Sequence, residues 1–263
     1  MEIITSGQYD LIYNAFSFAF ATLAAATIFF WLGRSQVAPQ YKSAMTITGL
    51  VTFIAAYHYF RIFESWGAAY DVSDGVVTTT GYAFNQAYRY VDWFLTVPLL
   101  LVELILVMGL SRSETISRAL RLGILAALMI ALGYPGEVAE TVTARWIWGI
   151  ASMIPFLWIV YELFAGLSKS IASQPEDARG LVKAARYVVV GSWAFYPVVY
   201  FAGAVGLDSA AATVIVEVGY TIADITAKAV FGVLIFMIAQ RKSASYFESH
   251  KAPVEKAAVR PTA

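Results

Sequence analysis

The chain has no cysteine, little histidine and little charge. None of its 263 residues is a cysteine, which excludes disulfides, thiol catalysis and cysteine-ligated metals. The two histidines, His58 and His250, lie far apart in sequence, so we expect no metal site. Only 14% of the residues are charged and 59% are hydrophobic, which is too apolar for a soluble domain of this size. We therefore expect a lipid bilayer, and not a nucleic acid, as the partner of this chain.

Long hydrophobic runs dominate the sequence. A helix needs roughly 20 apolar residues to cross a bilayer. Seven segments approach or exceed that length: residues 8–33, 43–66, 83–109, 116–134, 143–168, 181–204 and 210–240. The link 69–82 holds a run of valines and threonines that favours a short hairpin. These patterns predict an all-α integral membrane protein, a seven-transmembrane-helix bundle with a short β-hairpin between helices 2 and 3.

The chain is expected to form one helical domain over residues 1–242, with residues 243–263 as a flexible tail. Residues 1–10 contain no basic residue, so we expect the first apolar segment to be a span and not a cleaved signal peptide. With the N-terminus outside, 14 of the 18 basic residues lie in inner links and the tail: Arg34, Lys42, Arg112, Arg118, Arg121, Lys169, Arg179, Lys183, Arg186, Arg241, Lys242, Lys251, Lys256 and Arg260. The outer loops carry acids: Asp71, Asp74, Glu137, Glu140 and Asp208. Basic loops stay in the cytoplasm, so we expect an outside N-terminus and a plasma-membrane location.

Two acidic–basic patterns lie inside the predicted spans. An ionisable group there costs at least ~2.5–3.5 kcal/mol, so it needs a partner and a function. Lys228 lies well inside the seventh segment, four residues after Asp224 and on the same helix face. A structural ion pair is the alternative interpretation of these two residues.

The third segment carries a stripe of polar residues. Arg89, Asp92 and Thr96 share one helix face. Glu103 follows Asp92 by eleven residues, which is within ~20° of three whole turns and ~16 Å along the axis. Arg89 and a nearby cation favour ionised Asp92, whereas Glu103 lies among leucines and is expected to be protonated. Two acids on one stripe indicate stations on a proton path.

These residues resemble the motifs of microbial rhodopsins, and the resemblance covers nearly the whole chain. Asp224-Ile-Thr-Ala-Lys228 is similar to the retinal-lysine motif. Arg89-Tyr-Val-Asp92-Trp-Phe-Leu-Thr96, with Glu103, resembles the Asp-Thr-Glu triad of bacterial proton pumps. Trp193-Ala-Phe-Tyr196-Pro197 is similar to the aromatic floor beneath retinal. The pattern is closest to the proteorhodopsin and xanthorhodopsin type.

The resemblance implies that Lys228 carries all-trans retinal as a protonated Schiff base. Asp92 would be the principal counterion and proton acceptor, and Asp224 the second counterion. Glu103 would return a proton from the cytoplasmic side, and Arg89 would polarise the outward half-channel. The implied retinal pocket contains Trp93, Trp193, Tyr196, Pro197 and Tyr220.

Further residues narrow the subfamily. His58 matches the histidine that such pumps hydrogen-bond to the acceptor aspartate, although a lone histidine in a span is often structural. Gly149 stands where many relatives carry a tryptophan beside the retinal ring. The smaller glycine would open a window in that wall, where a hydroxylated carotenoid antenna could bind. The alternative is a helix-packing glycine. Leu100 matches the leucine of green-absorbing pumps. Glu217, seven residues before Asp224, is a candidate outer exit residue.

We therefore predict a light-driven outward proton pump, a transporter and not an enzyme. A sensory rhodopsin photoreceptor is the alternative, although Glu103 disfavours it because sensors commonly lack a donor carboxylate. A sodium pump would have Asn, Asp and Gln at 92, 96 and 103, and a chloride pump would lack the acid at 92. Neither pattern is present. A seven-helix ligand receptor without a chromophore is a weaker alternative. We expect a homo-oligomer (trimer, pentamer or hexamer), and we interpret Glu137 and Glu140 as ordinary solvated charges.

Overall fold

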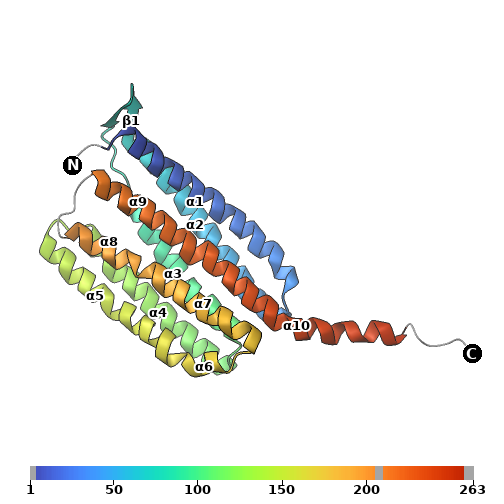
Figure 1. The fold of residues 1–263 in the computed structure, drawn as a ribbon. Coiled ribbons are helices and arrows are strands. Elements are labelled where there is room, and N and C mark those ends of the chain that lie inside the picture. The colour runs from blue at the N-terminus through green and yellow to red at the C-terminus, as the bar shows by residue number, and fades with distance from the viewer. Residues whose placement is uncertain (1–3, 205–209, 258–263) are drawn as a thin grey trace, which may run out of the picture.

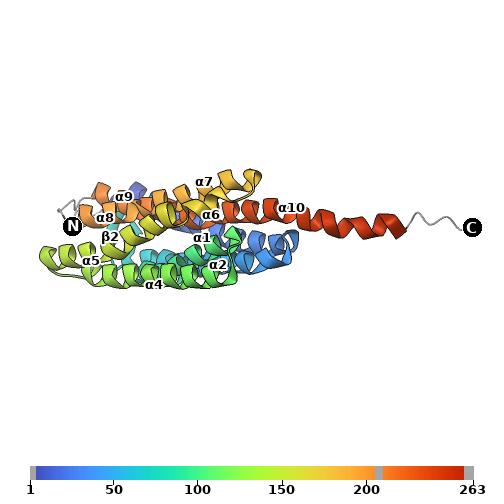
Figure 2. The same cartoon turned by 90° about the horizontal axis from the view of Figure 1, so that it is seen from below.

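The computed structural model describes residues 4–204 and 210–257 as a bundle of long helices lying side by side (Figures 1 and 2). The α-helices are α1 Ser6–Gly33, α2 Lys42–Ala69, α3 Ala87–Met108, α4 Arg112–Glu137, α5 Val142–Tyr161, α6 Ser168–Ala172, α7 Glu176–Trp193, α8 Phe195–Ala204, α9 Ala210–Ile225 and α10 Phe231–Ala257. Short 3₁₀ turns, η1 Arg34–Gln36 and η2 Pro39–Tyr41, link α1 to α2. Two π-helical turns are η3 Glu162–Gly166 and η4 Thr226–Val230.

In the described ranges these elements combine into the seven predicted rods. Rods one to four are α1 to α4, and the fifth is α5 continued by η3 and α6. The sixth is α7 with α8, and the seventh is α9, η4 and α10. Successive rods pack as neighbours, and α1 also packs against α9, which closes the bundle. The predicted seven-helix architecture is confirmed.

Length and apolar composition alone identify five membrane-spanning candidates among the described residues: Ser6–Gln36, Ala87–Met108, Arg112–Glu137, Val142–Gly166 and Ala210–His250. The rods outside this set are α2 and α7–α8. The first half of α7 carries several charges, and α7 and α8 are separate helices with Ala194 between them. These two rods belong to the bundle by their packing.

The hairpin between α2 and α3 is confirmed. Strands β1 Tyr70–Ser73 and β2 Val76–Thr79 are antiparallel, with Tyr70 opposite Thr79 and Ser73 opposite Val76. Asp74 and Gly75 form the turn with φ of 53° and 78°, the left-handed conformations that a tight hairpin turn requires. The hairpin covers the end of the bundle at which α1 begins (Figure 1).

Two of the rods are irregular where site residues lie. Pro197 has no N–H to donate to the carbonyl of Trp193, and the sixth rod is interrupted at Ala194. The π-helical turn η4 contains Lys228. Single π turns inside α-helices frequently occur at functional sites.

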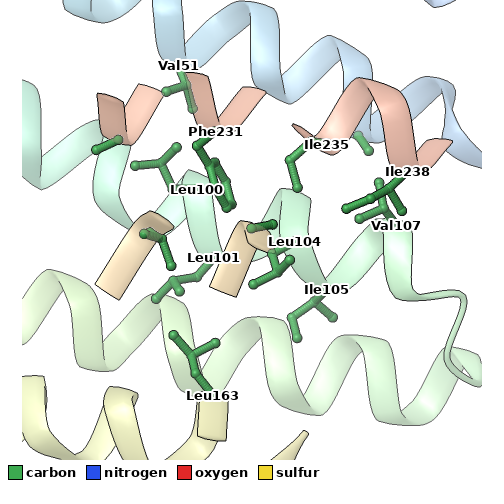
Figure 3. Packing of buried hydrophobic residues seen from close by; sticks show 14 of the residues in the cluster. Val51, Leu100, Leu101, Leu104, Ile105, Val107, Leu163, Phe231, Ile235 and Ile238 are labelled. Atoms are coloured by element: carbon green, nitrogen blue, oxygen red, sulfur yellow. The ribbon is translucent and has the colours of Figure 1, made fainter. Parts of the chain in front are cut away.

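An apolar cluster fills the half of the bundle that contains the end of α3. Leu104, Ile105 and Val107 of α3 are buried there with Ile235 and Ile238 of α10 (Figure 3). Beyond this cluster α10 projects out of the bundle (Figure 1) and stays helical to Ala257. Residues 258–263 of the predicted tail, and the loop acid Asp208, lie outside the described residues. The flexibility of the tail stays a prediction.

Candidate functional site

A buried lysine and two buried aspartates meet between the third and seventh rods. Lys228, Asp92 and Asp224 are each about 1% exposed. Nζ of Lys228 lies 3.0 Å from Oδ2 of Asp92 and also contacts Oδ1 of Asp224, one turn earlier on the same rod. The fold thus brings Asp92 to a lysine and a second aspartate that lie more than a hundred residues further along the sequence.

The two aspartates have different surroundings. Asp224 accepts hydrogen bonds from the hydroxyls of Tyr59 and Tyr196, both at 2.8 Å, and from Nε1 of Trp93 at 3.1 Å. Oδ1 of Asp92 is buried and has no hydrogen-bond partner in the described part of the chain. Asp224 is therefore held in place on several sides, whereas Asp92 has an oxygen left to receive a proton.

Thr96 and His58 lie beside Asp92 but do not hydrogen-bond to its carboxylate in this structure. The hydroxyl of Thr96 donates to the main-chain carbonyl of Asp92 at 2.8 Å. His58 is buried within electrostatic range of Asp92, and its Nδ1 faces the carbonyl of Ile54 at 2.9 Å. Nε2 is the nitrogen left for a carboxylate, so the pairing of His58 with Asp92 stays a prediction.

Arg89 is ion-paired to Glu217 at the hairpin end of the bundle. Both side chains are nearly fully buried, and Gln86 donates a hydrogen bond of 2.8 Å to the same carboxylate. The guanidinium also lies 5.1 Å from the ring centroid of Tyr220. Burial, with a smaller contribution from the negative charge of Glu217, raises the pKa of Tyr70 in the hairpin. Glu217 therefore lies between the buried Arg89 and the hairpin end of the bundle.

Glu103 lies alone at the other end of the polar stripe. Its side chain is fully buried, next to Leu104 in α3, and neither of its oxygens has a hydrogen-bond partner among the described residues. Leaving a bare carboxylate in such surroundings is very costly, so we expect the side chain to be protonated at rest. The stripe therefore has an ion-paired arginine at one end and, within the described residues, a buried acid without a hydrogen-bond partner at the other.

Lys228 lines a partly open cavity of about 790 Å³, a volume that includes solvent at its mouth. The predicted pocket residues all line it: Trp93, Leu100, Gly149, Trp193, Tyr196, Pro197 and Tyr220. A primary amine in the wall of an aromatic, mostly apolar cavity fits an apolar aldehyde such as retinal, which condenses with the amine.

Several cavity residues were not predicted: Tyr90, Val97, Met129, Ile130, Gly133, Ser152, Met153, Phe156, Tyr200, Phe201 and Ala227. A usable signal was present in the fifth rod. Gly149, Ser152, Met153 and Phe156 follow the spacing i, i+3, i+4, i+7 of one helix face. That face has no charge, so it resembles any packing face in a membrane bundle.

The space beside Gly149 is filled in this structure. A Cβ atom at Gly149 would lie 2.5 Å from the ring of Tyr200 and 2.9 Å from that of Phe201. The hydroxyl of Tyr200 donates to the carbonyl of Arg145 at 2.8 Å, which fixes its ring there. Gly149 thus allows close packing of α5 against α8 and also lines the cavity, and the carotenoid window stays a prediction.

The interpretation of Glu137 as an ordinary solvated charge is wrong. Its side chain is 24% exposed and lies 3.9 Å from Nη2 of Arg145. It also accepts a hydrogen bond of 3.3 Å from the hydroxyl of Tyr90, which lines the cavity. Helix α4 extends three residues beyond the predicted segment and carries Glu137 inward. Glu140 is exposed, as expected.

Comparisons with known proteins agree on the type of molecule. The family model described as bacteriorhodopsin-like protein matches residues 11–241. A green-light absorbing proteorhodopsin of Gamma-proteobacterium EBAC31A08 is 31% identical over 86% of this chain and 85% of its own. A blue-light absorbing proteorhodopsin of Gamma-proteobacterium Hot 75m4 is 30% identical over 90% and 89%. The solved structure of xanthorhodopsin, titled a light-driven ion pump with dual chromophore, is 49% identical with a TM-score of 0.91, covering 94% of this chain and 99% of that one.

Proposed function

Because the chain belongs to the bacteriorhodopsin-like family, within the bacterial branch of the microbial rhodopsins, we propose that its buried charges move protons outward across the plasma membrane. The family consists of integral membrane proteins with retinal as chromophore, and its light-driven ion pumps are transporters and not enzymes. Its proteorhodopsin and xanthorhodopsin relatives support a light-driven proton pump. The proposal adds the direction of transport and the residues that carry it.

The contact between Lys228 and Asp92 carries the proposal. Lys228 would hold retinal through Nζ, and the bound chromophore would supply light absorption and a light-driven change in the proton affinity of that nitrogen. Asp92 lies 3.0 Å from Nζ and has an unpartnered oxygen, so it is placed to accept the proton. Asp224 has its oxygens occupied by Tyr59, Tyr196 and Trp93, so it serves as a fixed counterion.

Glu103 is the source of the returning proton. It is neutral at rest and lies on the same stripe of α3 as Asp92, toward the end where α3 stops. The Arg89–Glu217 pair lies toward the opposite end. Because the acceptor Asp92 and the donor Glu103 lie on opposite sides of Lys228, protons move in one direction. That direction is outward when the hairpin end of the bundle faces the outside. The inner position of most basic residues supports that orientation.

Light-driven pH change tests the function as a whole. Cells expressing the chain, supplied with all-trans retinal, are expected to acidify an unbuffered medium under illumination. A protonophore should abolish the signal, and cells without retinal should show none. Alkalinisation of the medium would contradict the outward direction. A visible band with no pH change would favour the sensory alternative.

Replacing Glu103 with glutamine removes the donor and retains the shape of the side chain. Transfer from Lys228 to Asp92 should keep its rate, because Glu103 has no part in it. Return of a proton to Lys228 should slow at least about tenfold near neutral pH, because the proton must then come from water. The return rate should also fall about tenfold for each unit by which the pH is raised. Flash absorption between pH 6 and 9 measures both steps. An unchanged, pH-independent return rate in Glu103→Gln would refute the donor role.

Glu217 is proposed as part of the outer exit. Its carboxylate is ion-paired with buried Arg89 and accepts a hydrogen bond from Gln86, toward the end of α3 opposite to Glu103, so it lies beyond Asp92 on the proposed outward path.

Glu217→Gln is therefore expected to delay release of the proton to the outer medium, without slowing its transfer to Asp92. A pH-indicating dye follows the release, and absorption follows the transfer. Glu140→Gln is the matched control, because Glu140 is an exposed acid in a predicted outer loop. Equal release times in the Glu217 variant and in this control would exclude Glu217.

The finer properties of the pigment are also proposals. Leu100 lines the cavity, and its match to green-absorbing relatives supports green absorption. We propose that retinal is the chromophore that drives transport. A hydroxylated carotenoid antenna near Gly149 requires the rings of Tyr200 and Phe201 to move aside. Absorption and action spectra with and without added carotenoid test both points. Assembly as a trimer, pentamer or hexamer remains a proposal.

A further inference from the structure

The end of α3 beyond Glu103 is closed by a lysine from the seventh rod. Nζ of Lys242 donates to the main-chain carbonyls of Val107 and Met108, at 2.8 and 2.9 Å, and to Oε1 of Gln174 at 2.7 Å. These three acceptors use all the protons of one ammonium group. The last carbonyls of a helix have no partner within the helix and form its negative end, so a cation there is doubly favoured.

Gln174 connects the same point to the sixth rod. It is 5% exposed, directly precedes Pro175 and α7, and donates from Nε2 to the carbonyl of Met108 at 2.9 Å. Gly109 follows α3 with φ of 67°, and a Cβ there would lie 3.2 Å from Nζ of Lys242. The side chains of Lys242 and Gln174 therefore tie three rods together at one end of the bundle.

This tie lies over the acid proposed as the donor. Met108 is five residues beyond Glu103, about 7.5 Å along the helix axis. The intervening Leu104 and Val107 are buried in the apolar cluster of Figure 3, where Val107 is drawn beside Ile238 of α10. Glu103 has no exposed surface, so water must pass this end of the bundle before the acid can take up a new proton.

We infer that Lys242 and Gln174 form a latch that holds the end of α7 against α3 and thereby sets the rate of proton uptake by Glu103. The inference rests on the proposed donor role of Glu103. Lys242 is a positioning residue here, because it contacts carbonyls and an amide and not the transferred proton. Opening the latch breaks three hydrogen bonds from one ammonium group, so the closed state is favoured.

Lys242→Met tests the latch by removing the ammonium while retaining an apolar stem. Proton uptake should become at least about threefold faster, a barrier change of about 0.65 kcal/mol, while transfer from Lys228 to Asp92 keeps its rate. Lys242→Arg retains a charged donor and should restore slow uptake. Arg241→Met is the matched control, because Arg241 is an exposed neighbour on α10. A smaller or opposite change in Lys242→Met would overturn the inference.

Gln174→Leu is the second variant, and it should speed uptake in the same way. Combining it with Lys242→Met should add little, because both residues belong to one tie. A lower melting temperature without faster uptake would show that Lys242 only caps α3, and would also overturn the latch.

A distance measurement separates failure of the latch from failure of the donor role. The chain has no cysteine, so Ser113→Cys and Asp177→Cys place spin labels only at the exposed starts of α4 and α7. In darkness, Lys242→Met should broaden the distance distribution toward longer values. An unchanged distribution would refute the latch whatever Glu103 does. If Glu103→Gln keeps normal kinetics while the label distances in Lys242→Met broaden, the donor role fails, although Lys242 and Gln174 still hold α7 against α3.

Discussion

Replacing Lys228 with alanine should abolish the visible absorption band that forms on addition of all-trans retinal, and with it all light-driven proton movement. Lys228 is the one amine that lines the cavity, so no other residue there can link to the aldehyde. Absorption spectra measure the band, and borohydride reduction under light followed by peptide mapping locates the linkage. Lys183→Ala, an exposed lysine of α7, is the control and should keep a normal band.

Loss of the band must be distinguished from loss of the fold. Lys228→Ala leaves Asp92 and Asp224 buried without their cation, and removing one partner of a buried ion pair costs about 3–5 kcal/mol. Lys228→Arg keeps the positive charge but not the primary amine. It should therefore yield folded, colourless protein by circular dichroism and gel filtration. A visible band in folded Lys228→Arg would show that retinal is not held by this residue.

Replacing Asp92 with asparagine should reduce light-driven proton transport at least about 100-fold while the visible band remains, because a positioned proton acceptor contributes roughly 10²–10⁴-fold to a transfer rate. Asparagine keeps the size of the side chain but cannot take the proton from Nζ of Lys228, 3.0 Å away. Flash absorption should show no fast deprotonation of that nitrogen, and pH recordings should show no acidification.

Thr96→Val is a suitable control for Asp92→Asn. Thr96 hydrogen-bonds only the main chain of Asp92 in this structure, so its replacement should leave the acceptor in place. Transport by Thr96→Val should stay within about tenfold of the parent, because one net hydrogen bond contributes about 0.5–1.5 kcal/mol. If Asp92→Asn still transported protons, another group would be the acceptor, and the contrast drawn here between Asp92 and Asp224 would be wrong.

Much of the architecture was predictable from one-dimensional patterns. Apolar run length located the seven rods, and the valine–threonine run before Gly81 located the hairpin. Spacing within one helix also placed Asp224 with Lys228, and Asp92 with Glu103, because helix geometry relates residues a few turns apart. The family motifs then identified Trp193, Tyr196 and Tyr220, all of which line the cavity.

The remaining features depend on contacts between rods, which spacing does not encode. Arg89 and Glu217 are more than a hundred residues apart, and only the fold shows that they form a buried pair. The closeness of Tyr200 to Gly149 depends on how α8 packs against α5, so glycine alone did not reveal that its space is filled. Glu137 was misinterpreted because a longer α4 brings a predicted loop residue next to Tyr90.

The π-helical turn at Thr226–Val230 has a consequence for how the seventh rod tolerates change. Each residue added to or removed from a helix rotates everything beyond it by about 100°. Shortening this turn by one residue would give a more regular helix, yet it would turn Lys242 away from the end of α3 while Asp224 stayed in place. This stretch should thus accept replacement of its exposed Val230 but no change in length.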